Sequence, residues 1–242
     1  MKNTGKERII IVSVADLLAR GYNPEEIANA FVEINKKAWP PPFPQSILWT
    51  REQVLQHLIN CPHILYCAII KGEIVGTLSN IWTYENEALA TKSWDSISGN
   101  GTLSTHRKDG DTGFGLDMSV LPEFQGRGVS QILAFRSFLI GVVLSNKKGV
   151  FLGARIPMFY KSNLSVADYV FGKNENGKAL DPEIRLYLKD GFRIIKIVPN
   201  YIEDPESLNY GVLMFWKNPL YKFTKHLPLH WLKNLAKKII LG

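Results

Sequence analysis

The chain has 242 residues, of which 45% are apolar and 21% charged, with a net charge of +7 and two cysteines. This is the composition of an ordinary soluble globular protein with a sizeable core, and it excludes a disulfide-stapled scaffold. Because no apolar run reaches the ~18 residues of a membrane span, we expect a cytoplasmic protein, which could also be peripheral at the membrane through its basic C-terminus.

The first half of the chain predicts a strand, two helices and a hairpin. Asn23 and Thr50 are typical helix caps, and Pro24 suits a first helical turn. A short glycine-containing turn at 71–73 joins two apolar, strand-like runs. The predicted elements are a strand over 8–14, helices over 23–39 and 51–60, and strands over 63–70 and 74–84.

The second half adds four strands and two helices. Residues 85–111 are polar and glycine-rich, which predicts a long loop. The elements that follow are a strand over 113–121, a buried apolar helix over 129–148, a strand over 149–157, a helix over 181–190, and strands over 192–198 and 210–218. With no linker in sight, we expect one domain over 1–218 and a basic tail over 219–242.

Two glycines stand between an apolar strand and a helix, at Gly126 and Gly128. Glycine lets the backbone approach a ligand, and the unpaired amides at a helix start can bind phosphate oxygens. The dinucleotide fingerprint G-x-G-x-x-G does not fit, because position 131 is glutamine. The alternatives are an anion-binding turn and a plain strand-to-helix turn.

The segment "QGRGVS" (125–130) resembles the Q/R-x-x-G-x-G/A motif of the GNAT superfamily of N-acyltransferases. "SVLPEF" before it and "LYLKDGF" (186–192) resemble two further segments of that family, and the resemblance covers about residues 8–218. The closing half is most similar to GNAT domains that occur alone or fused to carbon–nitrogen hydrolases. The resemblance implies an α/β fold: a mixed, mostly antiparallel central sheet flanked by helices, with splayed central strands.

The resemblance also implies acyl-coenzyme A, or another acyl-phosphopantetheine thioester, as the donor, and no metal. The strand edge formed by Met118, Ser119 and Val120 would pair with pantetheine amides. The pyrophosphate would bind the turn and helix start, which consist of Gln125, Gly126, Arg127, Gly128, Val129 and Ser130. The family prefers Gly or Ala where this chain has Ser130, a small residue that should preserve the turn.

Amine acylation needs a base for the amine proton and an acid for the leaving thiolate. Tyr187 matches the family's tyrosine and is the candidate acid, with core packing as its alternative. Asp117, on the cofactor strand, is the candidate base or amine anchor, with a structural hydrogen bond as its alternative. His106 and Glu33 are weaker candidates, because an exposed loop and a solvated helix face explain them better.

Four further residues are candidates for an acceptor or acyl pocket: Trp39, Phe43, Trp82 and Arg155. Core packing explains the aromatic residues equally well, and Arg155 could hold a carboxylate or order its loop. Asp181-Pro182 stands where the family has an asparagine before the tyrosine helix. This departure puts in doubt the transfer of the family's cofactor contacts near that helix.

The C-terminal residues 217–242 hold six lysines and no acidic residue, so the rest of the chain is nearly neutral and no nucleic-acid face is expected. Within "LPLHWLKNLAKKIILG", helical spacing gives an apolar stripe of Leu232, Leu235, Ala236, Ile239 and Ile240. Lys233, Lys237 and Lys238 lie on the other side. Such a helix could bind an anionic membrane or an acidic acyl carrier protein, or pack on the body or on a second subunit of a homodimer.

Three functions remain open at this point. The first is transfer of an acyl group from acyl-CoA to a primary amine of a small molecule or peptide, by direct attack in a ternary complex. The second uses a long-chain acyl thioester, on coenzyme A or on an acyl carrier protein, to lipidate a peptide. The third is a non-catalytic module that binds acyl-CoA or a partner.

Overall fold

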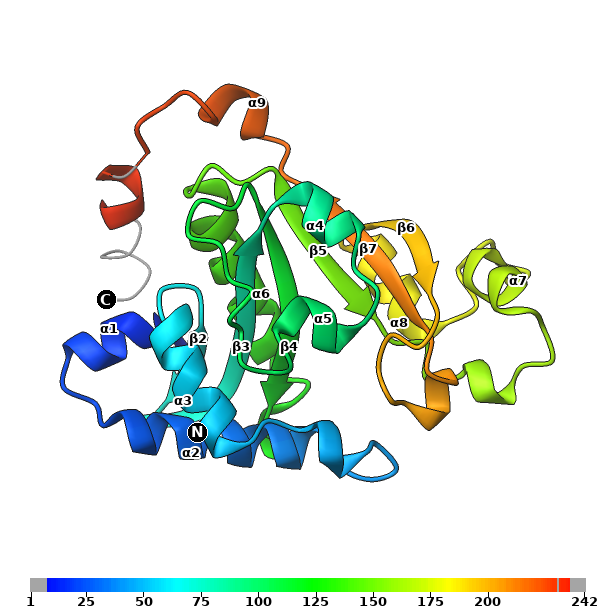
Figure 1. Cartoon of the computed structure of the whole chain (residues 1–242), viewed down its shortest axis with the longest axis horizontal. Coiled ribbons are helices and arrows are strands. Elements are labelled where there is room, and N and C mark those ends of the chain that lie inside the picture. Colours follow the sequence, from blue (N-terminus) through cyan, green and yellow to red (C-terminus); the bar gives the residue numbers. More distant parts are fainter. Residues whose placement is uncertain (1–7, 230, 236–242) are drawn as a thin grey trace, which may run out of the picture.

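The computed structural model describes residues 8–229 and 231–235. Its centre is a seven-stranded sheet in the order β1-β2-β3-β4-β5-β7-β6 (Figure 1). All neighbouring strands are antiparallel except β4 and β5, which are parallel. The predicted mixed, mostly antiparallel sheet flanked by helices is therefore confirmed. The strands are β1 (Ile10–Ser13), β2 (Tyr66–Ile70), β3 (Glu73–Thr83), β4 (Thr112–Val120), β5 (Gly149–Ala154), β6 (Arg193–Val198) and β7 (Gly211–Lys217).

Helices cover both faces of the sheet. On one face lie α2 (Pro24–Ala38), α3 (Arg51–Asn60) and α5 (Trp94–Ser98), whose apolar side chains share a core with inward residues of β1 to β5 and β7. On the other face α6 (Val129–Phe138) packs against β1 to β4, and α8 (Pro182–Lys189) packs against β5 and β7. The remaining helices are α1 (Val14–Ala19), α4 (Glu85–Leu89), α7 (Val166–Phe171) and α9 (Tyr221–Thr224).

Local sequence signals explain where α2 and α3 begin. The Asn23 side chain accepts a hydrogen bond from the Glu25 amide, and Pro24 occupies the first turn of α2. Thr50 and Gln53 form a capping box at the start of α3. These caps fix the helices that cover one face of the sheet, where Asn35 of α2 reaches Asp117 of β4.

The sheet opens between β4 and β5. The two strands pair only from Gly113 to Gly115, opposite residues 150–152, while β4 continues to Val120 along β3. A register shift between Ser79 and Asn80 of β3 leaves Leu116 as an extra residue on β4. The β4 edge from residue 116 to residue 120 therefore has no strand partner on the β5 side, which gives a splayed pair of central strands.

Three sequence predictions need correction. The first strand ends at Ser13, where the Ser13 hydroxyl accepts a hydrogen bond from the Asp16 amide and starts α1. The expected loop over 85–111 contains α4 and α5, because Ser93 and Ser96 form a capping box and Trp94 is buried. The apolar helix from Val129 is α-helical only to Phe138, continues as a π-helical turn over 139–143, and is not wholly buried.

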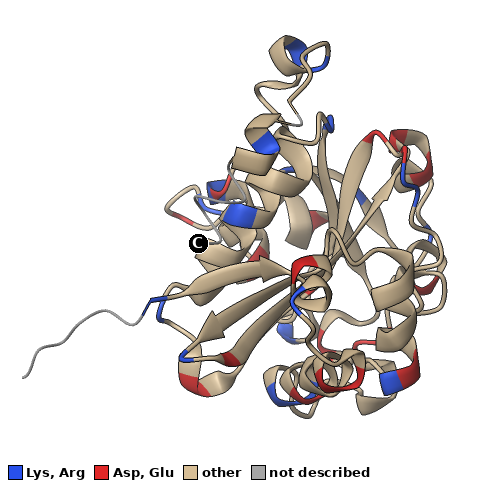
Figure 2. Ribbon diagram, turned by 90° about the vertical axis from the view of Figure 1, so that its left-hand side faces the viewer, with Lys and Arg blue, Asp and Glu red and all other residues tan. Residues whose placement is uncertain are grey.

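Figure 2 shows acidic and basic residues interspersed along the ribbon of the body. Cys61 and Cys67 are both free and buried. None of the helices formed by the described residues is long and apolar enough to cross a membrane.

Candidate active site

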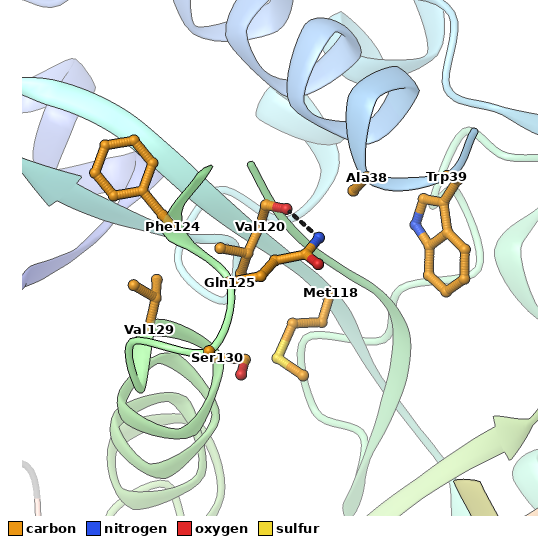
Figure 3. A pocket seen from close by; sticks show the side chains of 9 residues that line it. Ala38, Trp39, Met118, Val120, Phe124, Gln125, Val129 and Ser130 are labelled. Atoms are coloured by element: carbon orange, nitrogen blue, oxygen red, sulfur yellow. Dashed lines mark hydrogen bonds between the residues drawn. The ribbon is translucent and has the colours of Figure 1, made fainter. Parts of the chain in front are cut away.

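A pocket of about 290 Å³ lies where the C-terminal end of β4 meets the start of α6 and the end of α2 (Figure 3). It collects seven of the residues singled out in the sequence: Trp39, Met118, Val120, Gln125, Gly126, Val129 and Ser130. Ala38 and Phe124 complete its lining. The pocket is continuous with the β4 edge that lacks a strand partner, because Met118 and Val120 belong to both.

The glycine turn has a backbone that side-chain-bearing residues rarely adopt. Gly126 and Gly128 have φ angles of 71° and 84°, in the left-handed region. A Cβ atom added at either position would meet no atom within 4 Å, so both glycines border open space. The Gln125 side chain donates a 2.9 Å hydrogen bond to the Val120 carbonyl, visible in Figure 3, and ties the turn to the strand end.

The start of α6 fits an anionic group. Gly128 is its N-cap residue, and no side chain caps the first turn. The first amides of a helix have no partner inside the helix, and the helix dipole adds partial positive charge there. The turn therefore offers amides beside open space, as the pyrophosphate of coenzyme A requires. Arg127 lies beside it, with its guanidinium 5.3 Å from the Phe124 ring centroid.

Asp117 lies at the opening of the sheet, on the face covered by α2. Its carboxylate accepts hydrogen bonds from Asn35 Nδ2 at 3.1 Å, Trp39 Nε1 at 3.1 Å and the Ser119 hydroxyl at 3.0 Å. Burial raises the pKa of Asp117 to about 6, although these donors oppose the rise. A carboxyl group with this pKa can exchange a proton near neutral pH.

Arg155, Trp39 and Phe43 come together beyond the end of β5. The Arg155 guanidinium lies 5.4 Å from the Trp39 ring centroid and 4.8 Å from that of Phe43. It also donates two hydrogen bonds to the buried Asp204, at 2.8 and 3.0 Å, and one to Glu206 at 3.0 Å. The structure thus ties Arg155 to the loop between β6 and β7.

Tyr187 lies on α8, on the α6 side of the sheet, and packs edge-on against Phe192 at 5.5 Å. Burial raises the pKa of its phenol above the usual range, and the nearby Glu183 adds to the rise. Tyr187 is protonated at neutral pH, as an ordinary tyrosine is, and the raised pKa makes its phenol a weaker acid than a free one. Burial also raises the pKa of Glu183 to about 7, although Arg155 acts in the opposite direction.

Sequence reasoning missed Glu183 and Tyr201. Glu183 occupies the first turn of α8, where an acidic residue normally signals only helix stabilisation. The Tyr201 ring lies over Gly153 of β5 and Gly211 of β7, where an added Cβ would come within 2.1 and 2.4 Å of it. Glycines inside strands often mark a close approach of another group, so Gly153 and Gly211 could have indicated that a large side chain lies over these strands.

Trp82 and His106 lie at the other end of β4, away from this pocket. Trp82 pairs with Gly113, donates a hydrogen bond from Nε1 to the Gly141 carbonyl, and stacks at 5.7 Å on His106. His106 is half-buried rather than exposed, and burial lowers its pKa to about 4. Glu33 is exposed and pairs with Lys37.

Solved structures of two similar folds carry the family's name. The loading GNATL domain of CurA from Lyngbya majuscula matches 87% of this chain and 98% of its own, with a TM-score of 0.72 and 19% identity. The GphF GNAT-like decarboxylase in complex with isobutyryl-CoA matches the same shares with a TM-score of 0.66 and 21% identity. These likenesses define the fold as that of the GNAT class.

Sequence relatives narrow the class. The uncharacterized N-acetyltransferase YkwB of Bacillus subtilis is 33% identical over 208 residues, which are 85% of this chain and 91% of that protein. The probable hydrolase YhcX of the same organism is 28% identical over 200 residues, 81% of this chain but only 38% of YhcX. No protein-family model matches the chain. The identity and coverage of the match to YkwB show that the chain belongs to the GNAT N-acetyltransferases and is an acetyltransferase-type enzyme.

Proposed function

We propose that this enzyme transfers an acyl group from acyl-CoA to a primary amine, with donor and acceptor bound together. The observation that carries the proposal is the continuity between the open β4 edge and the Gly126–Gly128 turn. Acyl-CoA supplies the activated acyl group as a thioester. The amides of the turn and of the first turn of α6 would hold its pyrophosphate, and the β4 edge around Met118 to Val120 would hydrogen-bond the pantetheine arm.

The acceptor approaches from the face covered by α2. Asp117 reaches this face, and Trp39 and Phe43 flank Arg155 there. Close to Arg155 lie three further carboxyl groups, on Glu183, Asp204 and Glu206. Since one guanidinium faces three carboxyl groups besides Asp117, the acceptor end favours a positively charged amine over an anion.

Two side chains are suited to move protons on opposite faces of the sheet. Asp117, when ionised, can take a proton from the nitrogen of the acceptor amine. Tyr187 keeps its Oη proton at neutral pH and can donate it to a leaving thiolate sulfur. The enzyme is therefore expected to act on small amines or peptide amines without a metal ion.

The test incubates the purified full-length protein with acyl-CoA donors of increasing chain length and a panel of amines. Mass spectrometry follows the acylated product, and a thiol reagent follows free coenzyme A. We expect amine-dependent release of coenzyme A, faster with cationic amines than with neutral amines of equal size. Release of coenzyme A without any acylated amine across the panel would contradict the proposed acceptor class.

A further inference from the structure

The C-terminal segment comprises residues 219–242, and its described part, 219–229 and 231–235, contributes no residue to the pocket described above. The whole segment holds five lysines and no acidic residue. Its described part, 219–229 and 231–235, leaves the sheet after β7 and forms α9 at the end of the molecule opposite α2 (Figure 1). The sequence of α9, YKFT, contains one lysine and no acidic residue.

Specific contacts hold this segment against the body. Lys233 donates a 2.6 Å hydrogen bond from Nζ to the Ser145 hydroxyl, and its Nζ lies 5.5 Å from the Trp82 ring centroid. Asn146 Nδ2 donates a hydrogen bond to the Leu227 carbonyl at 3.2 Å, and Leu229 is buried. The spacing predicts Lys233 on the side of a helix opposite the apolar stripe, and in the structure this lysine contacts the body through Ser145.

The same contacts leave large apolar side chains of the segment in solvent. Phe223 is 75% exposed and Trp231 57% exposed. Leu220, Leu227 and Leu235 are each about half exposed. Of the predicted apolar stripe, Leu235 is thus not covered by the body, while Ala236, Ile239 and Ile240 lie outside the described residues. Exposed aromatic and aliphatic side chains among lysines are typical of a surface that binds a membrane or another protein.

We propose that the C-terminal segment binds the surface of a membrane that contains anionic lipids. Its exposed lysines Lys222 and Lys225 suit anionic headgroups, and its exposed tryptophan, phenylalanine and leucines suit the boundary between headgroups and acyl chains. A second copy of the chain is a poorer occupant, because a two-fold interface would place the lysine-rich segments against each other. A folded acidic protein is also a poorer fit, because the five exposed side chains are spread along the segment.

The test measures co-sedimentation of the full-length protein with vesicles of phosphatidylcholine alone and of phosphatidylcholine with 30–40% phosphatidylglycerol. We expect binding to the anionic vesicles that falls at least tenfold between 0.05 and 0.5 M salt, because salt screens lysine–headgroup attraction. The double variants Phe223→Ser/Trp231→Ser and Lys222→Glu/Lys225→Glu should each lower the affinity at least tenfold.

Matched controls change the same chemistry elsewhere on the surface. Phe135→Ser removes an exposed aromatic side chain from α6, and Lys92→Glu/Lys178→Glu reverses two exposed lysines. Both should bind anionic vesicles as the unmodified protein does, and all variants should keep its melting temperature and coenzyme A affinity.

Three results would overturn the proposal. The first is no binding to anionic vesicles at low salt, and the second is equal binding by the segment variants and the controls. The third is that the unmodified protein does not bind vesicles but self-associates or binds an acidic acyl carrier protein, and that the segment variants abolish this interaction. That result would assign the surface to a protein partner instead.

Discussion

Asp117 gathers three hydrogen-bond donors, yet burial still holds its pKa at about 6. If it acts as the base, kcat/KM should rise with pH through an apparent pKa near 6, because only the ionised carboxylate accepts a proton. Asp117→Asn should then lower turnover at least ~100-fold. If this variant keeps most of its turnover and its kcat/KM still rises near pH 6, Asp117 has a structural role. The rise in kcat/KM would then report the ionisation of another group.

The raised pKa of Asp117 also affects stability: activity should rise with pH, whereas the contribution of Asp117 to the free energy of unfolding should fall. Between the ordinary aspartate pKa of 3.8 and about 6, folded Asp117 keeps a proton that the unfolded chain has released. Its contribution to stability therefore falls as the pH rises through this window. Asp117→Asn should be at least as stable as the unmodified protein at pH 8, measured by urea unfolding, so lost activity cannot be ascribed to unfolding.

Tyr187 combines a packed ring with a phenol that burial keeps protonated. Tyr187→Phe keeps the ring contact with Phe192 and removes only the hydroxyl. If the hydroxyl is the acid, kcat should fall about 10²–10⁴-fold while the affinity for the donor stays nearly unchanged. Steady-state kinetics beside calorimetric donor titration separates the two quantities. Near-normal kcat would leave Tyr187 as a packing residue.

At the scale of elements, Arg155 links the end of β5 to the loop between β6 and β7. Its partner Asp204 is completely buried, and burial alone would raise the pKa of that carboxyl. Hydrogen bonds from Arg155 and Ser207 outweigh burial and hold the pKa below 3.8. The ion pair therefore stabilises the fold above pH 3.8, and this contribution is lost as the pH falls below that value.

Arg155→Met should destabilise the protein by ~3–5 kcal/mol at neutral pH, because it leaves Asp204 buried and unpaired. The matched control is Arg51→Met, whose partner Glu25 is exposed and whose loss should cost at most ~1 kcal/mol. Urea unfolding of both variants makes the comparison. Equal destabilisation by the two would show that Arg155 is not the link described here, and would return it to the candidates for binding substrate.

At the scale of the whole molecule, features encoded by neighbouring residues could be predicted and features built across the chain could not. The strand, glycine turn and helix around Gly126 and Gly128 form one continuous stretch, residues 112–138, and carry their own signals. The helices α4 and α5 have five residues each, too short for a periodic pattern, and α5 depends on the burial of Trp94 in the core.

The acceptor side shows the same limit. Trp39 and Phe43 were candidates for an acceptor or acyl pocket, and Arg155 was a candidate for holding a carboxylate or ordering its loop. The structure brings these three side chains together. Arg155 forms ion pairs with Asp204 and Glu206, which lie about 50 residues further along the sequence. No pattern in the neighbouring sequence predicts these pairs. Trp82 carried the same aromatic signal as Trp39, yet its place near one end of β4 takes it away from the pocket.

The central claim is that the glycine turn, the open strand edge and the start of α6 form one site for coenzyme A. Gly128→Glu would put a carboxylate into the pocket where the pyrophosphate should bind. Gly177→Glu is the matched control, because Gly177 has a φ of 70° and open space around it but lies in a distant loop. Both variants place a side chain at a positive φ and add the same charge.

The decisive measurement is a calorimetric titration of the folded protein and of both variants with coenzyme A. The account predicts that Gly128→Glu weakens binding at least tenfold, which is ~1.4 kcal/mol, while Gly177→Glu binds as the unmodified protein does. Unchanged binding by a folded Gly128→Glu variant, or an equal loss in both variants, would contradict it.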